Sequence, residues 1–305
     1  MDRTRRRTRA VRTGAAAMTV VALALAGCSS EPESFLVNGV DIGVKGDQPG
    51  TSSLFADGDY RGFDVTIAEA VLRGVGVDDP NPQGVLSRNR VNDLRKGKVK
   101  LVAATFSITP DRMKPRSANG DGLDFVGPYA VTHQGMLVRA DESGFYDDIK
   151  KFNKKNVCVW EETTSAKLLE EPAYKGIGHT TVTDAKQCIE GLKKGTYDAV
   201  STDQLILYGF AKENPELAVV ENVKIGPPNK YGIAMVKGHR EDCARLKKSL
   251  LKYLGGDGWS RAFDEYLKLP VKPGMPDMSD KIRESARPTT EEIEDSSCVD
   301  KLRGS

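Results

Sequence analysis

The sequence predicts an α/β protein made of two successive α/β units with a hinge between them. Short apolar runs alternate with amphipathic stretches of roughly ten to fifteen residues, a pattern typical of parallel strands joined by crossover helices. A polar, acidic segment at 140–144 interrupts this pattern, which then starts again. The 278 residues after residue 27 are more than one small hydrophobic core requires, so two units are the default expectation.

The first unit is expected to begin with a strand at 39–44. A helix at 63–73 follows, because its apolar residues recur at helical spacing and share one face. Further strands are expected at 99–104 and 136–139. The last of these strands leads directly into 140–144, which is therefore the candidate hinge.

The second unit repeats the alternation of strands and helices. We expect strands at 157–160, 180–182 and 199–202, and helices at 165–171, 184–193 and 205–213. A strand at 231–236 and two amphipathic helices at 240–254 and 259–267 come next. From residue 268 onward, repeated prolines and charged residues predict an extended tail, in which 289–293 could begin a short helix.

The first 27 residues have the pattern of an export signal. An arginine-rich start precedes an apolar run at 15–26, which is too short to span a bilayer comfortably. The following Leu25-Ala26-Gly27-Cys28 resembles the lipobox of bacterial lipoproteins. The resemblance implies cleavage before Cys28, a diacylglycerol on its sulfur, a polar leash at 28–38 and a place on the extracytoplasmic face of the cell membrane. An ordinary secretory signal with a chance cysteine is the alternative.

The charge of the chain gives no reason to expect nucleic acid as a partner. Lysine and arginine number 45 and aspartate and glutamate 43, but 1–27 hold six of the basic and one of the acidic residues, which leaves 39 against 42. A near-neutral chain without a basic run lacks the electrostatic footprint of nucleic-acid binding. No pattern supports a homo-oligomer, so we expect a monomer.

Four further cysteines stand in a chain expected to reach an oxidising exterior, where an even number usually means disulfides. Four cysteines allow three pairings. We expect Cys158 to pair with Cys188, because the strand and the helix that carry them are adjacent layers of one α/β unit. Cys243 would then pair with Cys298 and hold the tail; free buried thiols are the alternative. Without a CxxC motif or closely spaced histidines, no metal site is expected.

Eight short motifs follow one another between Gly39 and Leu269. They are Gly43–Gly50, Gly62–Val65 with Ile67–Ala70, Arg90–Leu94 with Gly97, Ser107–Arg112, Asp124–Tyr129, Gly135–Arg139, Gly195–Asp203 and Tyr231–Ala234. In this order they resemble the extracellular solute-binding proteins of polar amino-acid ABC importers, family 3. The Asp-Gln-Pro-Gly element at 47–50 looks most like the glutamate-binding lipoproteins of actinobacteria, a subgroup that cysteines near 158, 188 and 243 also fit.

The resemblance implies a two-lobed periplasmic-binding-protein fold of type II with a hinge between the lobes. Lobe 1 would comprise 39–139 plus 231–269 and lobe 2 would comprise 140–230, followed by the tail at 270–305. It also implies a binding protein rather than an enzyme, which needs no cofactor. Such a protein would capture an amino acid, glutamate or aspartate, and deliver it to an ABC permease in the membrane.

The physical needs of an amino-acid site point to two charged residues. A zwitterion in a buried cleft needs a cation for its carboxylate and an anion for its ammonium, because unpaired buried charges are costly. Arg112 suits the carboxylate, since a guanidinium can form two parallel hydrogen bonds with it. Asp203, at the end of a strand in lobe 2, suits the ammonium. The alternatives are a surface arginine and a plain helix N-cap.

Hydroxyl residues are expected to complete the clamp. Thr105 and Ser107 follow the strand at 99–104, and the family match places them beside Arg112. Thr163 and Thr164 begin a helix, so their amides and hydroxyls can meet a carboxylate oxygen at a helix N-terminus.

Three further residues bear on specificity. Lys45 and Arg90 lie beside matched motifs and could neutralise a side-chain carboxylate of the ligand; solvated surface charges are the alternative. Glu162 stands where the family usually carries glycine. A Glu162 carboxylate pointing into the cleft would repel an acidic ligand and favour a cationic one.

Two other functions fit the same fold. A sensing lipoprotein would report amino-acid supply to a membrane receptor instead of loading a transporter. Some dehydratases also resemble these proteins, but the sequence shows no nucleophile beside a base and no metal pair.

Overall fold

The computed structural model describes residues 32–268 and 279–302, which belong to one compact unit spanning 31–305. The predicted export signal, Cys28 and the start of the tail at 270–278 lie outside the described residues, so the predictions made for them stay predictions.

A mixed nine-stranded sheet runs through the described residues, in the order β5-β1-β6-β12-β7-β10-β8-β9, with β11 paired to β7. Its strands are β1 (Asp41–Val44), β5 (Asn81–Gly84), β6 (Leu101–Val102), β7 (Leu123–Arg139), β8 (Asn156–Trp160), β9 (Gly178–Val182), β10 (Ala199–Asp203), β11 (Leu217–Val219) and β12 (Ile225–Val236). A smaller antiparallel sheet contains β2 (Asp47–Gln48), β3 (Ser52–Leu54) and β4 (Tyr60–Arg61).

Helices cover both faces of the large sheet. They are α1 (Phe63–Arg73), α2 (Arg90–Arg95), α3 (Pro110–Met113), α4 (Thr164–Leu169), α5 (Ala185–Lys193), α6 (Gln204–Glu213), α7 (Arg240–Gly255), α8 (Gly258–Tyr266), α9 (Ser279–Ala286) and α10 (Thr290–Ser296). Short 3₁₀ turns are η1 (Ser87–Asn89), η2 (Arg116–Ala118), η3 (Ala140–Phe145), η4 (Ile149–Phe152) and η5 (Pro172–Tyr174). The strands and helices expected from the sequence are present, although β6 is shorter and β7 much longer than predicted.

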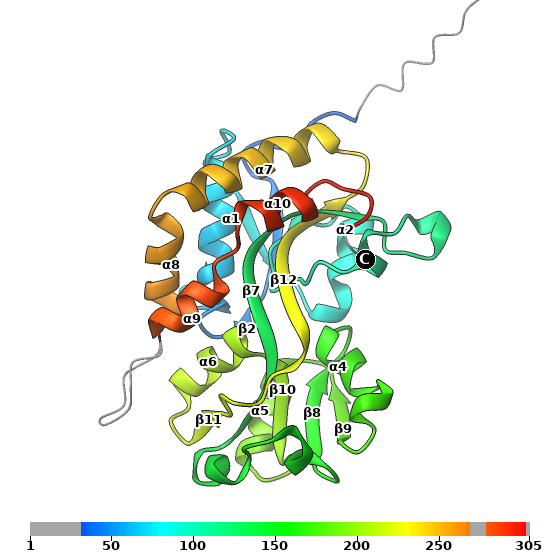
Figure 1. Ribbon diagram of the computed structural model, residues 1–305. Coiled ribbons are helices and arrows are strands. Elements are labelled where there is room, and N and C mark those ends of the chain that lie inside the picture. Colours follow the sequence, from blue (N-terminus) through cyan, green and yellow to red (C-terminus); the bar gives the residue numbers. More distant parts are fainter. Residues whose placement is uncertain (1–31, 269–278, 303–305) are drawn as a thin grey trace, which may run out of the picture. The chain divides into compact units, whose positions relative to one another are not determined.

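Two lobes share strands β7 and β12, which run antiparallel and side by side from one lobe into the other (Figure 1). Each lobe has one apolar cluster on each face of the sheet, because successive side chains of a strand point to opposite faces. In lobe 1, Val126 packs on one face and Phe125 on the other. In lobe 2, Met136 and Leu137 do the same.

The connection between the lobes corrects the predicted hinge. Segment 140–144 is not a link between the lobes, because it forms η3 at the end of β7 and its Ala140 amide donates to Glu216 O, beside β11. Residues 136–139 pack in the core of lobe 2 rather than ending lobe 1. The chain crosses between lobes within β7 and within β12.

The tail is folded rather than extended over 279–302. Thr289 and Glu292 form a reciprocal capping box that starts α10, the short helix that the sequence allowed. Ser297 closes the end of the helix onto strand β7, where its hydroxyl accepts from Gly127 N at 2.9 Å and donates to Gly127 O at 2.8 Å.

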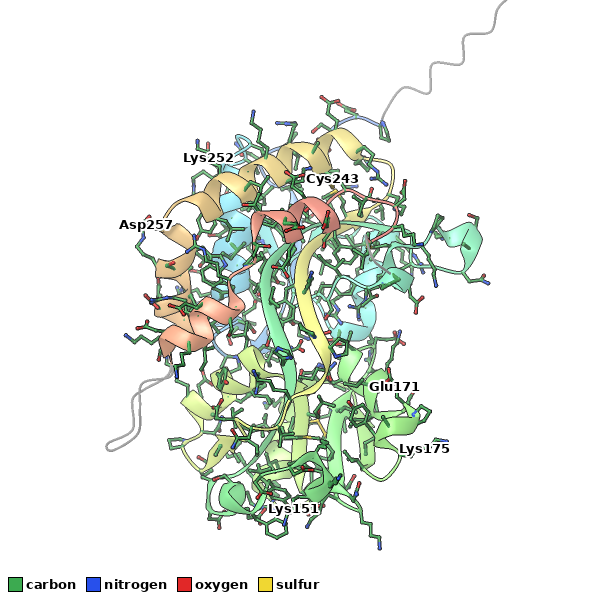
Figure 2. The ribbon with its side chains drawn as sticks, in the orientation of Figure 1. Lys151, Glu171, Lys175, Cys243, Lys252 and Asp257 are labelled. Carbon is green, nitrogen blue, oxygen red and sulfur yellow. A yellow bond between two sulfur atoms is a disulfide. The ribbon has the colours of Figure 1, made fainter. Side chains whose placement is uncertain are left out.

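Both expected disulfides are present. Cys158–Cys188 joins β8 to α5, and Cys243–Cys298 joins α7 to the residues that follow α10. Figure 2 labels Cys243 where α7 lies next to α10. The second bridge therefore makes the folded part of the tail a covalent part of lobe 1.

Candidate ligand-binding site

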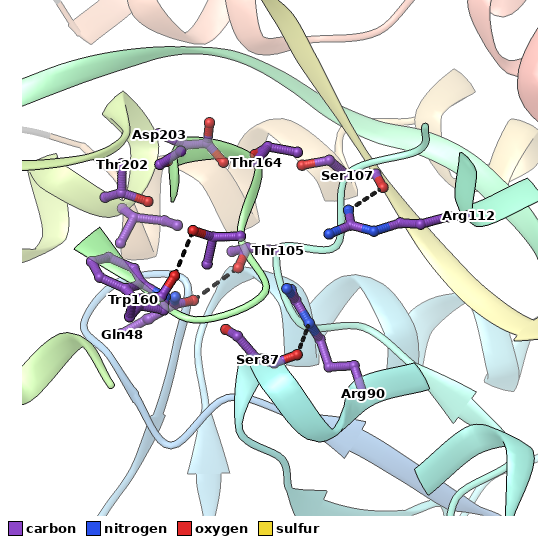
Figure 3. A pocket seen from close by; sticks show the side chains of 13 residues that line it. Gln48, Ser87, Arg90, Thr105, Ser107, Arg112, Trp160, Thr164, Thr202 and Asp203 are labelled. Carbon is purple, nitrogen blue, oxygen red and sulfur yellow. Dashed lines mark hydrogen bonds between the residues drawn. The ribbon is translucent and has the colours of Figure 1, made fainter. Parts of the chain in front are cut away.

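A small cavity lies between the lobes, where several strands of both lobes end (Figure 3). Ligands of open α/β sheets commonly bind at the carboxyl ends of strands, as here. The lining residues from lobe 1 are Gln48, Ser87, Arg90, Thr105, Ser107 and Arg112, and those from lobe 2 are Trp160, Thr163, Thr164, Ser165, Thr202, Asp203 and Ile206.

Arg112 is buried in the cavity wall rather than on the surface. Thr109 caps the short helix α3 and thereby places Arg112 on its first turn. The Arg112 Nη1 donates to Ser107 O at 2.6 Å, and its guanidinium lies 4.3 Å from the centre of the Phe106 ring. Burial lowers the Arg112 pKa to about 10, which leaves the side chain charged at neutral pH.

Arg90 stands beside Arg112 as a second buried cation. It donates from Nε to Ser87 O at 3.1 Å and from Nη1 to Ala104 O at 3.0 Å, and it also lies 4.3 Å from the centre of the Phe106 ring. Burial, followed by repulsion from Arg112, lowers the Arg90 pKa to about 9. The two buried guanidiniums both lie against the Phe106 ring, and an anion bound beside them would offset the cost of burying two positive charges.

The Glu162 backbone, and not its side chain, faces these arginines. The Glu162 carbonyl oxygen accepts from Arg90 Nη2 at 3.1 Å and from Arg112 Nη2 at 3.5 Å. Its φ of +55° is a conformation that glycine adopts readily, which gives a physical reason for the glycine that the family usually carries there. The Glu162 side chain is exposed and does not line the cavity. The Glu162 carboxylate thus does not point into the cavity, although its negative charge raises the pKa of both arginines against the lowering effect of burial.

Asp203 faces the cavity from lobe 2. Asp203 is the N-cap residue of α6, but its side chain makes no capping hydrogen bond, so its carboxylate does not serve as a helix cap. Its two oxygens accept instead from Asn229 Nδ2 at 2.6 Å and Tyr231 Oη at 2.8 Å. Burial raises the Asp203 pKa to about 6, against the lowering effect of these two donors.

Thr105 is held in a strained backbone conformation at the floor of the cavity. Its φ of +47° is a rare value for a β-branched residue. The Thr105 amide donates to Asp64 Oδ2 at 2.7 Å, and its hydroxyl donates to Gln48 Oε1 at 2.9 Å. Asp64 is fully buried, and burial raises its pKa to about 7.

Thr163 and Thr164 begin helix α4, as predicted. Thr163 caps the helix by accepting from Ala166 N at 3.2 Å, while its hydroxyl donates to Trp160 O at 2.7 Å. Asn229 donates to Thr164 Oγ1 at 3.2 Å as well as to Asp203, so this amide joins both sides of the lobe 2 wall.

Lys45 is the one predicted ligand contact that does not line the cavity. It is buried, and its Nζ lies 3.1 Å from Asp47 Oδ1. Asp47 Oδ2 in turn accepts from the Ala185 amide of lobe 2 at 3.3 Å. Lys45 thus supports a contact between the lobes, and Arg90 remains as the predicted cation for a ligand side chain.

Sequence reasoning missed part of the wall. Gln48 lay inside a matched motif but was not singled out, and Ser87 comes just before the motif at 90–94. Trp160 was interpreted only as the end of an apolar strand, and Thr202 as part of the motif that ends in Asp203. Ser165 and Ile206 carried no signal of their own beyond helix spacing.

No group of three histidine, cysteine or acidic side chains suited to a metal ion is present at 32–268 or 279–302. Over the same residues, no helix is long and apolar enough to cross a membrane.

Comparison with known proteins identifies the family. Residues 40–284 match the bacterial extracellular solute-binding proteins, family 3. The chain belongs to this family. Two relatives of this solute-binding protein are the glutamate-binding protein GluB of Corynebacterium glutamicum, 30% identical over 86% of this chain and 92% of the relative, and the glutamine-binding protein GlnH of Bacillus subtilis, 26% identical over 70% and 75%.

Solved structures agree on the fold of this solute-binding protein. A cysteine-binding protein from Campylobacter jejuni has a TM-score of 0.69 and 22% identity over 81% of this chain and 94% of that one. A solute receptor for L-cysteine from Neisseria gonorrhoeae has a TM-score of 0.68 and 24% identity over 82% and 96%. The predicted two-lobed periplasmic-binding-protein fold is confirmed.

Proposed function

We propose that the protein captures an acidic amino acid, glutamate or aspartate, outside the cell and delivers it to an ABC importer. The observation that carries the proposal is the pair of buried, opposite charges that face one cavity from different lobes. Arg112 lines it from lobe 1 and Asp203 from lobe 2. An amino acid carries the complementary charges, a carboxylate that can pair with Arg112 and an ammonium that can pair with Asp203.

The two charges divide the work of binding a zwitterion. Arg112 has guanidinium hydrogens beyond those used on Ser107 O and Glu162 O, and a carboxylate accepts them in a charge-assisted pair. Asp203 keeps oxygen lone pairs beyond those used by Asn229 and Tyr231, which an ammonium can fill. Thr105, Ser107, Thr163 and Thr164 supply hydroxyl and backbone groups around them.

Arg90 favours a second carboxylate on the ligand. Its guanidinium is buried beside Arg112 and no carboxylate among the described residues forms a salt bridge with it within 4.0 Å. A side-chain carboxylate would relieve this excess of positive charge, whereas a lysine or arginine ligand would increase it. The name of the GluB relative, a glutamate-binding protein, agrees with this choice.

Ligand contacts from both lobes would couple binding to closure. The lobes already touch through Asp47 and the Ala185 amide, and through Arg88, whose Nη1 donates to Glu161 Oε2 at 2.9 Å. A ligand held by Arg112 and Asp203 at once binds this arrangement more tightly than a separated one. It therefore shifts the population toward the closed form that a permease can recognise.

We further propose that Cys28 carries a lipid that holds the protein at the outer face of the membrane, as a monomer. A long tail beyond what the fold needs would be a hint of an additional partner, such as the membrane receptor of the sensing alternative. Residues 279–302 pack on lobe 1 and are bound to it by Cys243–Cys298, so they complete this lobe instead of forming a spare docking segment. A protein that binds and releases its ligand unchanged needs no catalytic group, and prolonged incubation should return the amino acid intact.

Calorimetric titration of the protein without residues 1–27 tests the ligand directly. We expect binding on the order of 8 kcal/mol or tighter for glutamate or aspartate, and weaker binding of lysine and arginine. Arg112→Ala should weaken binding by about 2–5 kcal/mol, because it leaves the ligand carboxylate buried without its partner. Arg116→Ala, an exposed arginine on η2, is the matched control and should bind like the parent. Preference for a cationic amino acid would refute the acidic-ligand proposal, and a loss below tenfold in Arg112→Ala would refute the carboxylate clamp.

A further inference from the structure

Trp160 holds a buried hydrogen-bond donor that the protein itself does not satisfy. The residue ends strand β8, is 1% exposed and lines the cavity. Its indole Nε1 is buried and has no hydrogen-bond partner among the described residues. The other tryptophan, Trp259, is also buried, but its Nε1 donates to Tyr129 O at 2.7 Å. Buried donors are almost always paired, so an orphan in a ligand cavity indicates a partner that arrives with the ligand.

The position of the Trp160 ring is fixed by its surroundings. It packs in the apolar cluster of lobe 2 that contains the Cys158–Cys188 bridge and Leu207. On the backbone side, its carbonyl accepts from the Thr163 hydroxyl at 2.7 Å. The ring is therefore held in the apolar cluster, and its Nε1 has no partner from the described part of the protein.

The wall around Trp160 holds acceptors as well as donors, since Thr202 and Asp203 lie on the same side of the cavity in Figure 3. In Figure 3, Trp160 and Gln48 lie on the side of the cavity opposite Arg112. The Gln48 Oε1 lies 2.9 Å from the Thr105 hydroxyl, which also lies 2.8 Å from Ala104 O and can donate its one hydrogen to only one of them. Arg90 adds guanidinium hydrogens beyond the three bonds it makes to backbone oxygens. A ligand oxygen at this wall would supply the acceptor that the indole of Trp160 lacks.

We propose that Trp160 Nε1 donates a hydrogen bond to an oxygen of the ligand side chain and so selects amino acids with a side-chain carboxylate or carboxamide. The inference rests on the proposed function, because it presupposes an amino acid held by Arg112 and Asp203. It deepens that function by naming a neutral donor, besides Arg90, that reads the end of the ligand side chain. A ligand ending in an ammonium or an apolar group would leave the indole unpaired and bind less tightly.

The inference can be tested in the unsubstituted protein by following the NMR signals of the two indole N–H groups. The chain has two tryptophans, so a ¹H–¹⁵N spectrum contains two indole N–H signals, which Trp160→Phe assigns. Saturation with glutamate should move the Trp160 signal downfield, as hydrogen bonding does, and leave the Trp259 signal in place. Norvaline, whose side chain has no acceptor, should bind without that downfield shift. An unmoved Trp160 signal with glutamate bound would overturn the inference.

Calorimetry on Trp160→Phe provides the second measurement. The variant should lose between about fivefold and 100-fold in affinity for glutamate and keep its affinity for norvaline. An equal loss for both ligands, or no loss for glutamate, would overturn the role of Trp160 while leaving the proposed function intact. If the parent protein bound no amino acid at all, the proposed function would fall and this inference with it.

Discussion

Gly209 of lobe 2 packs directly against the carbonyl group of Pro49 in lobe 1. The glycine lies on α6, and the proline follows β2. A Cβ atom built on Gly209 would collide with Pro49 O and would lie 3.5 Å from the Gly50 amide nitrogen. The contact joins the two lobes, so the absence of a side chain at Gly209 is a requirement of this arrangement of the lobes and not of helix α6 itself.

Gly209→Ala should therefore weaken ligand binding without weakening the fold. A collision with backbone cannot be relieved by a rotamer change, so the lobes must separate slightly and the contacts made to both of them suffer. We expect at least a tenfold loss of affinity by calorimetry, with an unfolding temperature equal to or above that of the parent, because alanine favours a helix over glycine. Gly255→Ala is the control, since a Cβ at this helical glycine meets open space. Unchanged affinity in Gly209→Ala would show that the ligand-bound lobes do not meet here.

Asp203 should make ligand affinity fall in acid. Burial raises its pKa to about 6 in the ligand-free site, so the carboxylate that pairs with a ligand ammonium is present above pH 6 and is lost below it. Between pH 7 and pH 5 the affinity should drop about tenfold, because a proton must leave Asp203 before the ammonium can bind. Asp203→Asn should bind more weakly at pH 7 and should show a flat profile over the same range. A parent profile that is equally flat would contradict the role given to Asp203.

The contrast between β7 and α1 shows which features the sequence determines locally. Helix α1 was predicted with its observed bounds, because its buried face follows helical spacing. Strand β7 was predicted only at 136–139, since Gly127-Pro128 and the polar Thr132 and Gln134 look like a break in an apolar run. These residues continue the strand because β12 pairs with them from a distance of about 100 residues in the sequence, and no local pattern records that pairing.

The site divides in the same way. Arg112 could be predicted as a site residue because it ends a motif that matches a known family and because its guanidinium can pair with the carboxylate of an amino acid. Lys45 carried an equal charge beside another motif, but a neighbouring aspartate two residues away already pairs with it. Trp160 was missed since an apolar residue at a strand end is ordinary in the core, and only the unpaired indole nitrogen distinguishes it.

Asp64 should make the ligand-free protein less stable as pH rises from about 4 to 7. Its folded-state pKa of about 7 lies above the ordinary value of 3.8, so between these values the folded protein holds a proton that the unfolded chain has released. The free energy of unfolding then falls with rising pH by up to about 1.4 kcal/mol per unit from this group, and the effect ends above pH 7. In urea unfolding measured from pH 4 to 8, Asp64→Asn should reduce the slope by up to about 1.4 kcal/mol per unit and leave the smaller part due to Asp203, while the exposed Asp59→Asn keeps the parental slope. A parental slope in Asp64→Asn would assign the pH dependence to another group.

The tail disulfide should stabilise lobe 1 without contributing to ligand recognition. Cys243 and Cys298 are 55 residues apart in the sequence, so opening the bridge frees a long loop in the unfolded chain. In the chain-entropy model the double variant Cys243→Ser with Cys298→Ser loses about 4 kcal/mol of unfolding free energy, comparable to the loss expected for the 30-residue loop of Cys158–Cys188. Ligand affinity should stay within about twofold of the parent below the unfolding transition, because neither cysteine lines the cavity. Denaturant unfolding and calorimetry on the same samples measure both quantities. A large loss of affinity with little loss of stability would instead show that the tail acts on the ligand site through strand β7, where Ser297 is bonded to Gly127.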